Sequence, residues 1–226
     1  GPGSHVGCMR KAPCFPGDSS KAGHKGFLMR NKQMIISDMR TYVMGDIHGN
    51  WKALVQCLER SGFNRQEDRL IQLGDIVDGY DEVMECVEEL LTLKNLIAIR
   101  GNHDAWFFTY ILSGSHPDQW RQGGYNTARS YLRPLGKDHL LIGDSYGYKT
   151  ALNPGDIPDA HRRFFECQVP YYLDGDGRCF VHGGFDRHLP FYPQHEDIYL
   201  WDRSLWEQAL CYEAGRRDAG GSEELR

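Results

Sequence analysis

The chain has 226 residues, with 26 lysines and arginines against 31 aspartates and glutamates, and a formal net charge of −5. At roughly 150 residues per domain, this length predicts one full domain with room for an appendage. The mild acidity argues against a general nucleic-acid or membrane-surface binder, which needs a basic face. The 40% hydrophobic share is ordinary for a globular protein, and no apolar run approaches the ~20 residues that would span a bilayer.

Residues 1–38 differ in composition from the rest. They open on Gly1-Pro2-Gly3-Ser4, which is typical of the remnant of a cleaved expression tag, and have no continuous apolar segment. We expect this stretch to be flexible, without a signal peptide, and residues 39–226 to form the domain. Seven cysteines, an odd number without C-x-x-C spacing, fit neither a disulfide framework nor a zinc finger. Free buried thiols in a reducing, cytoplasmic compartment are the better interpretation.

The regular part of the chain alternates short β-prone runs with helical periodicity. The pattern predicts strand, helix, strand, helix and strand over residues 41–44, 51–60, 69–73, 81–93 and 96–99. This β-α-β-α-β order implies a parallel sheet with right-handed crossovers and an α/β fold.

The later elements are predicted individually. Two helices, two strands and a last helix are expected over residues 105–112, 125–132, 169–173, 178–181 and 205–213. The tetrad at 174–177 predicts a hairpin turn between the two strands. A calcium loop is the weaker alternative, because the glycine spacing and the closing glutamate are wrong.

Polar clusters with glycines follow four of the predicted strands. They read GDIHGN at 45–50, GDIVDG at 74–79, GNHD at 101–104 and VHGG at 181–184. Any one of them alone is typical of an ordinary turn or surface loop. In open α/β sheets, however, ligands bind beyond the carboxyl ends of the strands, so we expect the four clusters to meet in one crevice.

The donors in these clusters are oxygens and imidazoles without a thiolate. They belong to Asp46, His48, Asp75, Asn102 and His182. Such a set suits manganese, iron or zinc better than copper(I) or an iron–sulfur cluster. One shared carboxylate can bridge two cations, and a pair ~3.5–4 Å apart can generate a hydroxide and clamp an in-line phosphoryl displacement.

The order of these motifs resembles that of the calcineurin-like metallophosphoesterases, and is most similar to their PPP branch. That branch includes serine/threonine protein phosphatases, compact bacterial and phage phosphatases, and symmetric dinucleoside tetraphosphatases. The resemblance covers roughly residues 41–203. It implies central β-sheets flanked by helices, with a metal site at the carboxyl ends of the strands, and a two-metal hydrolase that attacks phosphomonoesters with a metal-bound hydroxide.

The resemblance also implies a role for each metal ligand. Asp46 and His48 would hold the first ion, Asp75 would bridge, and Asn102 and His182 would hold the second. Manganese is the first expectation for both ions, with iron or zinc as alternatives.

Four further residues take roles from the same resemblance. His103 would be the general acid that protonates the leaving oxygen, and Asp78 would orient it by hydrogen bonding. Arg100 and Arg203 would bind phosphate, since a guanidinium fork suits a phosphoryl group that accumulates charge. For Arg203, an ordinary surface residue at a helix start is an equally weighted alternative.

Two departures from the PPP pattern stand out. Gly79-Tyr80 replaces the arginine that usually follows the second aspartate of the second motif, so one phosphate contact is absent. The branch also has a further histidine, in a Gly-His motif, a few tens of residues beyond the fourth cluster. The chain has no histidine after Arg203, so we expect the natural chain to continue past Arg226.

Three functional hypotheses follow. The first is a metal-dependent phosphoesterase acting on phosphomonoesters, including phosphoserine or phosphothreonine in proteins. The second is a dinucleoside tetraphosphate hydrolase, which the GNHD spelling slightly favours. The third is a non-catalytic binding module with an incomplete metal centre. The expected partner is a phosphorylated protein or small phosphoester, not nucleic acid or a membrane.

Overall fold

A computed structural model describes residues 39–116, 122–140, 142–144 and 147–219 of the chain. The predicted flexible segment 1–38 lies outside the described residues.

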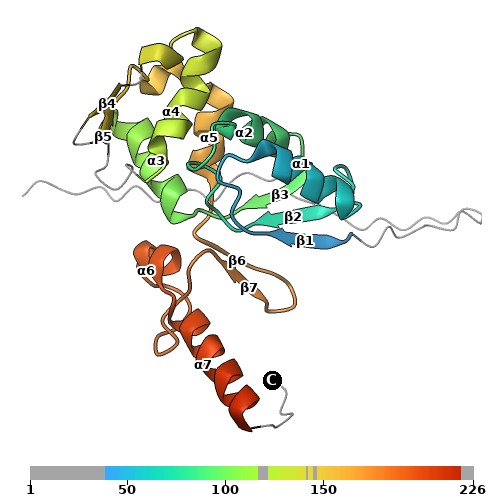
Figure 1. The fold of residues 1–226 in the computed structure, drawn as a ribbon. Coiled ribbons are helices and arrows are strands. Elements are labelled where there is room, and N and C mark those ends of the chain that lie inside the picture. Colours follow the sequence, from blue (N-terminus) through green and yellow to red (C-terminus); the bar gives the residue numbers. More distant parts are fainter. Residues whose placement is uncertain (1–38, 117–121, 141, 145–146, 220–226) are drawn as a thin grey trace, which may run out of the picture. The chain divides into compact units, whose positions relative to one another are not determined.

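The predicted parallel sheet is confirmed. Its strands lie in the order β1-β2-β3, and helices α1 and α2 make the two crossovers on one face of the sheet (Figure 1). The bounds are β1 (Thr41–Met44), α1 (Trp51–Arg60), β2 (Arg69–Gln72), α2 (Val83–Leu91) and β3 (Asn95–Ala98). All three strands therefore end at the same edge of the sheet.

Apolar residues spaced three or four positions apart on the two helices build the core against this sheet. Leu54 and Leu58 lie one turn apart on α1 and are buried, as are Val83, Val87 and Leu90 on α2. Burying each such side chain contributes about 1.5–3 kcal/mol. The two crossover helices are therefore fixed by hydrophobic packing, which also holds the loops between strands and helices in place.

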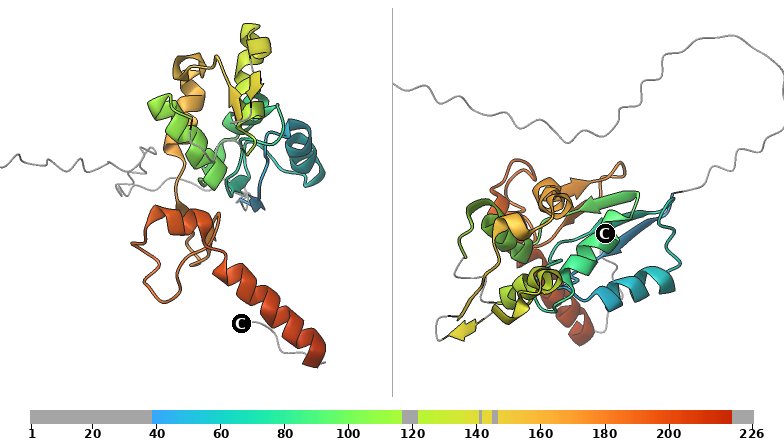
Figure 2. Two further views of the ribbon diagram at one scale, coloured as in Figure 1. Left: turned by 60° about the vertical axis from the view of Figure 1, so that its left-hand side comes forward. Right: turned by 90° about the horizontal axis from the view of Figure 1, so that it is seen from above.

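A second group of helices packs beyond α2 (Figure 2). It consists of α3 (Asn102–Ser113), α4 (Gly124–Leu132) and α5 (Asp159–Cys167). Phe107 of α3 joins the group, since its ring lies 5.6 Å from Tyr131 of α4 and 5.1 Å from Phe165 of α5 between centroids. Helix α3 begins three residues earlier than predicted, so the GNHD motif forms its first turn.

Several elements were not predicted. They are the short strands β4 (Ile142–Asp144) and β5 (Gly147–Lys149), helices α5 and α6 (Glu196–Trp201), and the 3₁₀ turns η2 (Arg133–Leu135), η3 (Asp138–Leu140) and η4 (Pro154–Asp156). Helix α5 was missed because its sequence is largely charged, and only His161, Phe164 and Phe165 are buried.

The predicted hairpin at the fourth motif is confirmed. Strands β6 (Tyr171–Leu173) and β7 (Cys179–Val181) pair antiparallel, and β6 is preceded by a parallel bridge from Val169 to Ile99 at the end of β3. The carboxylate of Asp174 accepts hydrogen bonds from the backbone N–H groups of Asp176 and Arg178. It therefore closes a turn, as predicted, and the last helix, α7 (Ser204–Ala219), is longer than expected.

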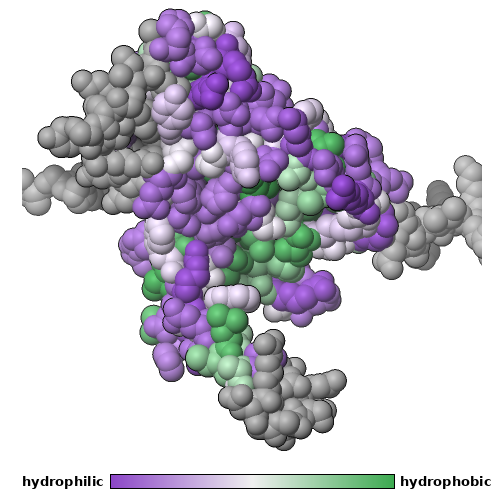
Figure 3. All heavy atoms as spheres, in the orientation of Figure 1, coloured by the Kyte–Doolittle hydropathy of each residue, from purple (hydrophilic) through white to green (hydrophobic). Residues whose placement is uncertain are grey.

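The other face of the parallel sheet carries an apolar row. Val43, Ile71 and Ile97 are direct neighbours across the three strands. Ile71 is fully buried, whereas Val43 on the outer strand is 51% exposed. Hydrophobic residues accordingly reach the surface in this part of the domain (Figure 3).

The described cysteines are free, but the prediction that such thiols are buried was wrong for most of them. Cys86 is buried, Cys179 is intermediate, and Cys57, Cys167 and Cys211 are exposed. Among the helices that the structure describes, none has the length and apolar character needed to cross a bilayer.

One buried histidine should make the domain sensitive to acid. The ring of His161 is 3% exposed, and its Nδ1 accepts a hydrogen bond from the hydroxyl of Tyr131 at 3.0 Å. Burial lowers the pKa of His161 from 6.5 to about 4. The folded state therefore holds this ring neutral, and the unfolded state binds the proton first as the pH falls.

We expect the free energy of unfolding contributed at His161 to be complete above pH 6.5 and to fall as the pH drops toward 4. The loss is about 1.4 kcal/mol per pH unit and about 3 kcal/mol in all. Urea unfolding in EDTA buffers across this range, on the wild-type chain and His161→Phe, measures it. The variant should show a shallower slope, and equal slopes would contradict the assignment.

Candidate active site

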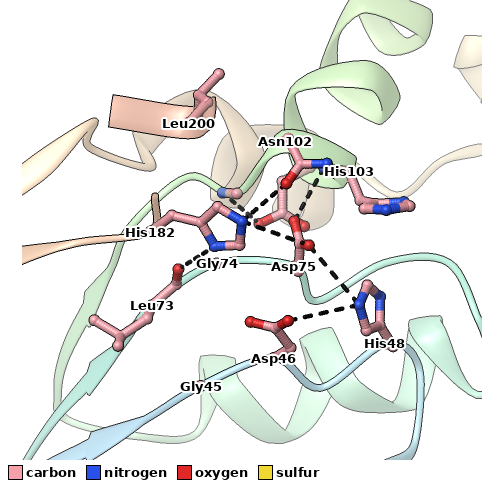
Figure 4. Close-up of polar contacts among 12 residues, drawn as sticks. Gly45, Asp46, His48, Leu73, Gly74, Asp75, Asn102, His103, His182 and Leu200 are labelled. Atoms are coloured by element: carbon pink, nitrogen blue, oxygen red, sulfur yellow. Dashed lines mark hydrogen bonds and ion pairs between the residues drawn. The ribbon is translucent and has the colours of Figure 1, made fainter. Parts of the chain in front are cut away.

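The four motif clusters do meet at one edge of the sheet (Figure 4). Asp46 and His48 follow β1, Asp75 follows β2, Asn102 opens α3 after β3, and His182 follows β7. All five predicted metal-ligand residues are thus brought together from four separate segments. The carboxylate of Asp75 lies at the centre of the group.

The first group of donors consists of Asp46, His48 and Asp75. One ligand atom from each lies within 4.8 Å of the other two. The Nε2 atom of His48 is 3.8 Å from Oδ2 of Asp46 and 3.8 Å from Oδ2 of Asp75. These separations leave room for an ion between the three atoms, since ligand bonds to nitrogen and oxygen are about 2.0–2.2 Å.

Both imidazoles are held so that Nε2 points at Asp75. The Nδ1–H of His48 donates to the carbonyl oxygen of Val77 at 3.0 Å, and that of His182 donates to the carbonyl oxygen of Leu73 at 2.8 Å. A carbonyl only accepts, so Nδ1 carries a proton, and Nε2 is the ring nitrogen left to face the site. This is how metal-binding histidines are usually oriented.

The second group of donors consists of Asp75, Asn102 and His182. Nε2 of His182 is 3.6 Å from Oδ2 of Asp75 and 2.9 Å from Oδ1 of Asn102. With Nδ1 directed at Leu73, the remaining ring nitrogen, the amide oxygen of Asn102 and the Asp75 carboxylate converge on one point. A cation there would satisfy all three donors, so they fit a second ion.

The backbone at the site is held in an uncommon conformation. Among the described non-glycine residues, His48, Asp75 and Asp78 have positive φ angles of 48°, 55° and 69°. Each such residue costs on the order of 1 kcal/mol or more, and strain of this kind clusters at functional sites. Gly101 is also required, because a Cβ there would collide with the carboxylate and backbone nitrogen of Asp75.

Asp78 and His103 form the pair that the sequence predicted. Nδ1 of His103 is 2.7 Å from Oδ2 of Asp78, whose side chain is 1% exposed. The His103 ring also stands edge-on to the His48 ring, with centroids 5.1 Å apart. His103 therefore lies beside the donor groups, and its Nδ1 is held by the hydrogen bond to Asp78.

Thr127 on α4 is a partner of this pair that the sequence did not reveal. Its buried hydroxyl donates to Oδ1 of Asp78 at 2.6 Å and accepts from the backbone N–H of Asp78 at 2.9 Å. A single threonine inside a helix carries no sequence signal for such a role. The hydroxyl fixes both the backbone and the carboxylate of Asp78.

The charges around His103 determine how it holds its proton. Burial alone would lower the pKa of His103, but the hydrogen bond to Asp78 and the nearby carboxylates of Asp75, Asp78 and Asp104 outweigh burial and raise it. The ring thus retains its proton more readily than a free imidazole does.

Asp104 is a buried support for the loop after β2. Its carboxylate accepts from the backbone N–H groups of Ile76, Val77 and Gly101, and from the side-chain amide of Gln168. Burial, followed by the Asp75 charge, raises the pKa of Asp104 to about 6. Asp104, the last residue of the GNHD motif, therefore positions Asp75 through the backbone of the two residues that follow it.

The two predicted phosphate-binding arginines have other contacts in the structure. Arg100 donates to the carboxylate of Glu196 and to the carbonyl oxygen of Phe165, each at 3.0 Å. Arg203 donates to the carbonyl oxygen of Leu200 at 3.2 Å, and its guanidinium lies against Gly183. Phosphate binding by either arginine stays a prediction.

Comparison with known proteins agrees with this geometry. The family model described as calcineurin-like phosphoesterase matches residues 39–201. The chain belongs to the calcineurin-like phosphoesterase family, and the donor groups lie at the carboxyl ends of the strands of its α/β fold.

Curated relatives of two kinds are similar to parts of the chain. Symmetrical bis(5'-nucleosyl)-tetraphosphatases from Pseudomonas fluorescens and Haemophilus influenzae are 37% identical over 104 residues and 39% identical over 67 residues. Serine/threonine-protein phosphatase 1 from Salmonella typhimurium is 36% identical over 63 residues. These alignments cover 46%, 29% and 28% of this chain. The chain spans only 35%, 24% and 29% of the length of these relatives.

Replacing Thr127 by valine tests the support of Asp78. Valine keeps the shape but removes the hydroxyl that two buried groups of Asp78 use, so we expect a loss of about 1–3 kcal/mol of unfolding free energy. Urea unfolding measures it. Thr127→Ser is the matched control and should retain most of the stability. Equal stability of the valine variant and the wild type would show that the hydroxyl contributes nothing.

Proposed function

We propose that this chain carries the metal centre of a phosphoesterase that hydrolyses phosphomonoesters with two divalent ions. The observation that carries the proposal is the orientation of His48 and His182, whose Nε2 atoms face Asp75 from opposite sides. Oxygen and imidazole donors without thiolate suit manganese first, with iron or zinc as alternatives. When bound, the two metal ions would supply charge neutralisation and an activated nucleophile at neutral pH.

The residues of the chain supply the rest of the chemistry. His103 donates a proton to the leaving oxygen, and Asp78 holds the ring in the required orientation and tautomer. Thr127 keeps Asp78 in place. This buried chain of hydrogen bonds argues against the non-catalytic binding module, because a scaffold needs no oriented acid.

The substrate class has two candidates. A phosphomonoester, including phosphoserine or phosphothreonine, fits the similarity to a serine/threonine phosphatase. A dinucleoside tetraphosphate is the second candidate, which the longer alignment with symmetrical tetraphosphatases favours. Hydrolysis of p-nitrophenyl phosphate and of a dinucleoside tetraphosphate, each with and without manganese, separates them. A cytoplasmic location fits the free cysteines.

The two donor groups should bind ions with different affinity. The first offers two carboxylates and an imidazole, whereas the second has one shared carboxylate, an imidazole and a weaker amide oxygen. We expect EDTA to abolish hydrolysis and manganese to restore it, with two unequal binding steps in calorimetric titration. Full activity in chelator would refute the two-metal proposal.

Two matched variants assign these steps. His48→Gln should weaken the tighter step and His182→Gln the weaker one, each by at least ~10–100-fold, since even an outer partner of a metal site is worth that much. Elemental analysis confirms the occupancy. Loss of both steps in His182→Gln would contradict the assignment.

Replacing His103 tests the general acid. His103→Asn should lower kcat by ~10²–10⁴ with metal content nearly unchanged. The loss should shrink for substrates with good leaving groups, such as p-nitrophenyl phosphate, because these need little protonation. Steady-state kinetics across a leaving-group series measures this. A uniform loss across the series, or loss of metal, would show that His103 is structural.

A further inference from the structure

Three aromatic rings form a row that leads away from the proposed acid. The His103 ring meets Trp106 of α3 edge-on, with centroids 4.6 Å apart, and Trp106 in turn meets Trp201 at the end of α6, with centroids 5.6 Å apart. Residues almost a hundred positions apart in the sequence are thus joined next to the metal-ligand groups.

The far end of this row is open to solvent. Trp201 is 48% exposed, while Trp106 is partly buried between it and His103. An indole is costly to leave in water, and its flat face stacks well on other flat rings. Because Trp106 supports the ring on one side, Trp201 is held in place and ready to stack without further ordering.

The row starts from the group that faces the leaving oxygen. If His103 is the acid, as the proposed function holds, then Trp106 and Trp201 lie on the leaving-group side of the bond that breaks. A phenyl ester places its ring directly on the leaving oxygen, whereas a nucleotide places its base beyond a ribose. Trp201, the exposed ring, lies farther along the row from His103 than Trp106 does. This larger distance suits a base that is separated from the leaving oxygen by a ribose.

We propose that Trp201, supported by Trp106, is a stacking surface for the nucleobase of a nucleotide whose phosphate occupies the metal centre. This proposal rests on the proposed function and names a nucleoside phosphate as the substrate class. Arg203 follows two residues later, with its guanidinium against Gly183, the residue after His182, so one short segment would serve the base and the phosphate. Stacking of a base on an aromatic side chain is sequence-tolerant, so adenine and guanine should both bind.

The test measures binding of AMP to the manganese-loaded chain by calorimetry, with inorganic phosphate as the probe that lacks a base. Trp201→Leu should weaken AMP binding by about 5–150-fold, the range expected for one stacked base, and should leave phosphate affinity unchanged. Trp201→Phe should recover most of the AMP affinity. Trp206→Leu, at a tryptophan on α7 that is more exposed than Trp201 (64% against 48%), is the control and should bind AMP like the wild type.

Three binding results would overturn the proposal. Unchanged AMP affinity in Trp201→Leu excludes stacking, and equal losses for AMP and phosphate make Trp201 a structural residue. If Trp201→Leu weakens the binding of phenyl phosphate as much as that of AMP, then the surface binds a ring attached directly to the leaving oxygen and not a nucleobase. Hydrolysis is scored separately: a selective AMP loss without turnover of any phosphoester retains the stacking surface and rejects the catalytic proposal.

Discussion

The position of the Asp75 carboxylate is the constraint on which the site depends. Oδ1 accepts the backbone N–H of His103 at 3.0 Å, so the carboxylate caps the start of α3. Oδ2 faces His48 at 3.8 Å and His182 at 3.6 Å. A negative charge at a helix N-terminus is favourable, and one carboxylate that serves a helix and two imidazoles orders three segments at once. Moving it would separate the two donor groups and displace the proposed acid.

The convergence of the motifs could be predicted because strand ends in a parallel sheet share one edge. Asp46, Asp75 and Asn102 follow from that rule directly. His182 was predicted from the same rule and does join the group, although β7 belongs to a separate hairpin and not to the parallel sheet. Thr127 could not be predicted, because its role arises only when α4 packs against the loop after β2. Helix α5 was missed because its polar sequence hides a short buried face.

Polar contacts act together with the buried side chains of Ile47, Ile76 and Val77 to hold the loops of the site. The buried Asp104 carboxylate gathers the N–H groups of Ile76, Val77 and Gly101, and thereby ties the loop after β2 to the first turn of α3. Arg100 ties the end of β3 to α5 and α6 through Phe165 and Glu196. Buried hydrogen bonds of this kind favour a single arrangement of the loops, so the donors are positioned before any ligand arrives.

The left-handed backbone at His48, Asp75 and Asp78 lowers the stability of the fold at three residues that the proposed activity requires. Glycine adopts such angles without the steric cost that a side chain incurs, so replacing any of the three by glycine would relieve strain while removing a donor or the partner of the acid. Selection for thermal robustness alone would therefore drift toward chains that keep the fold and lose the chemistry. Directed evolution of this domain should accordingly hold these three positions constant and seek stability in the helices instead.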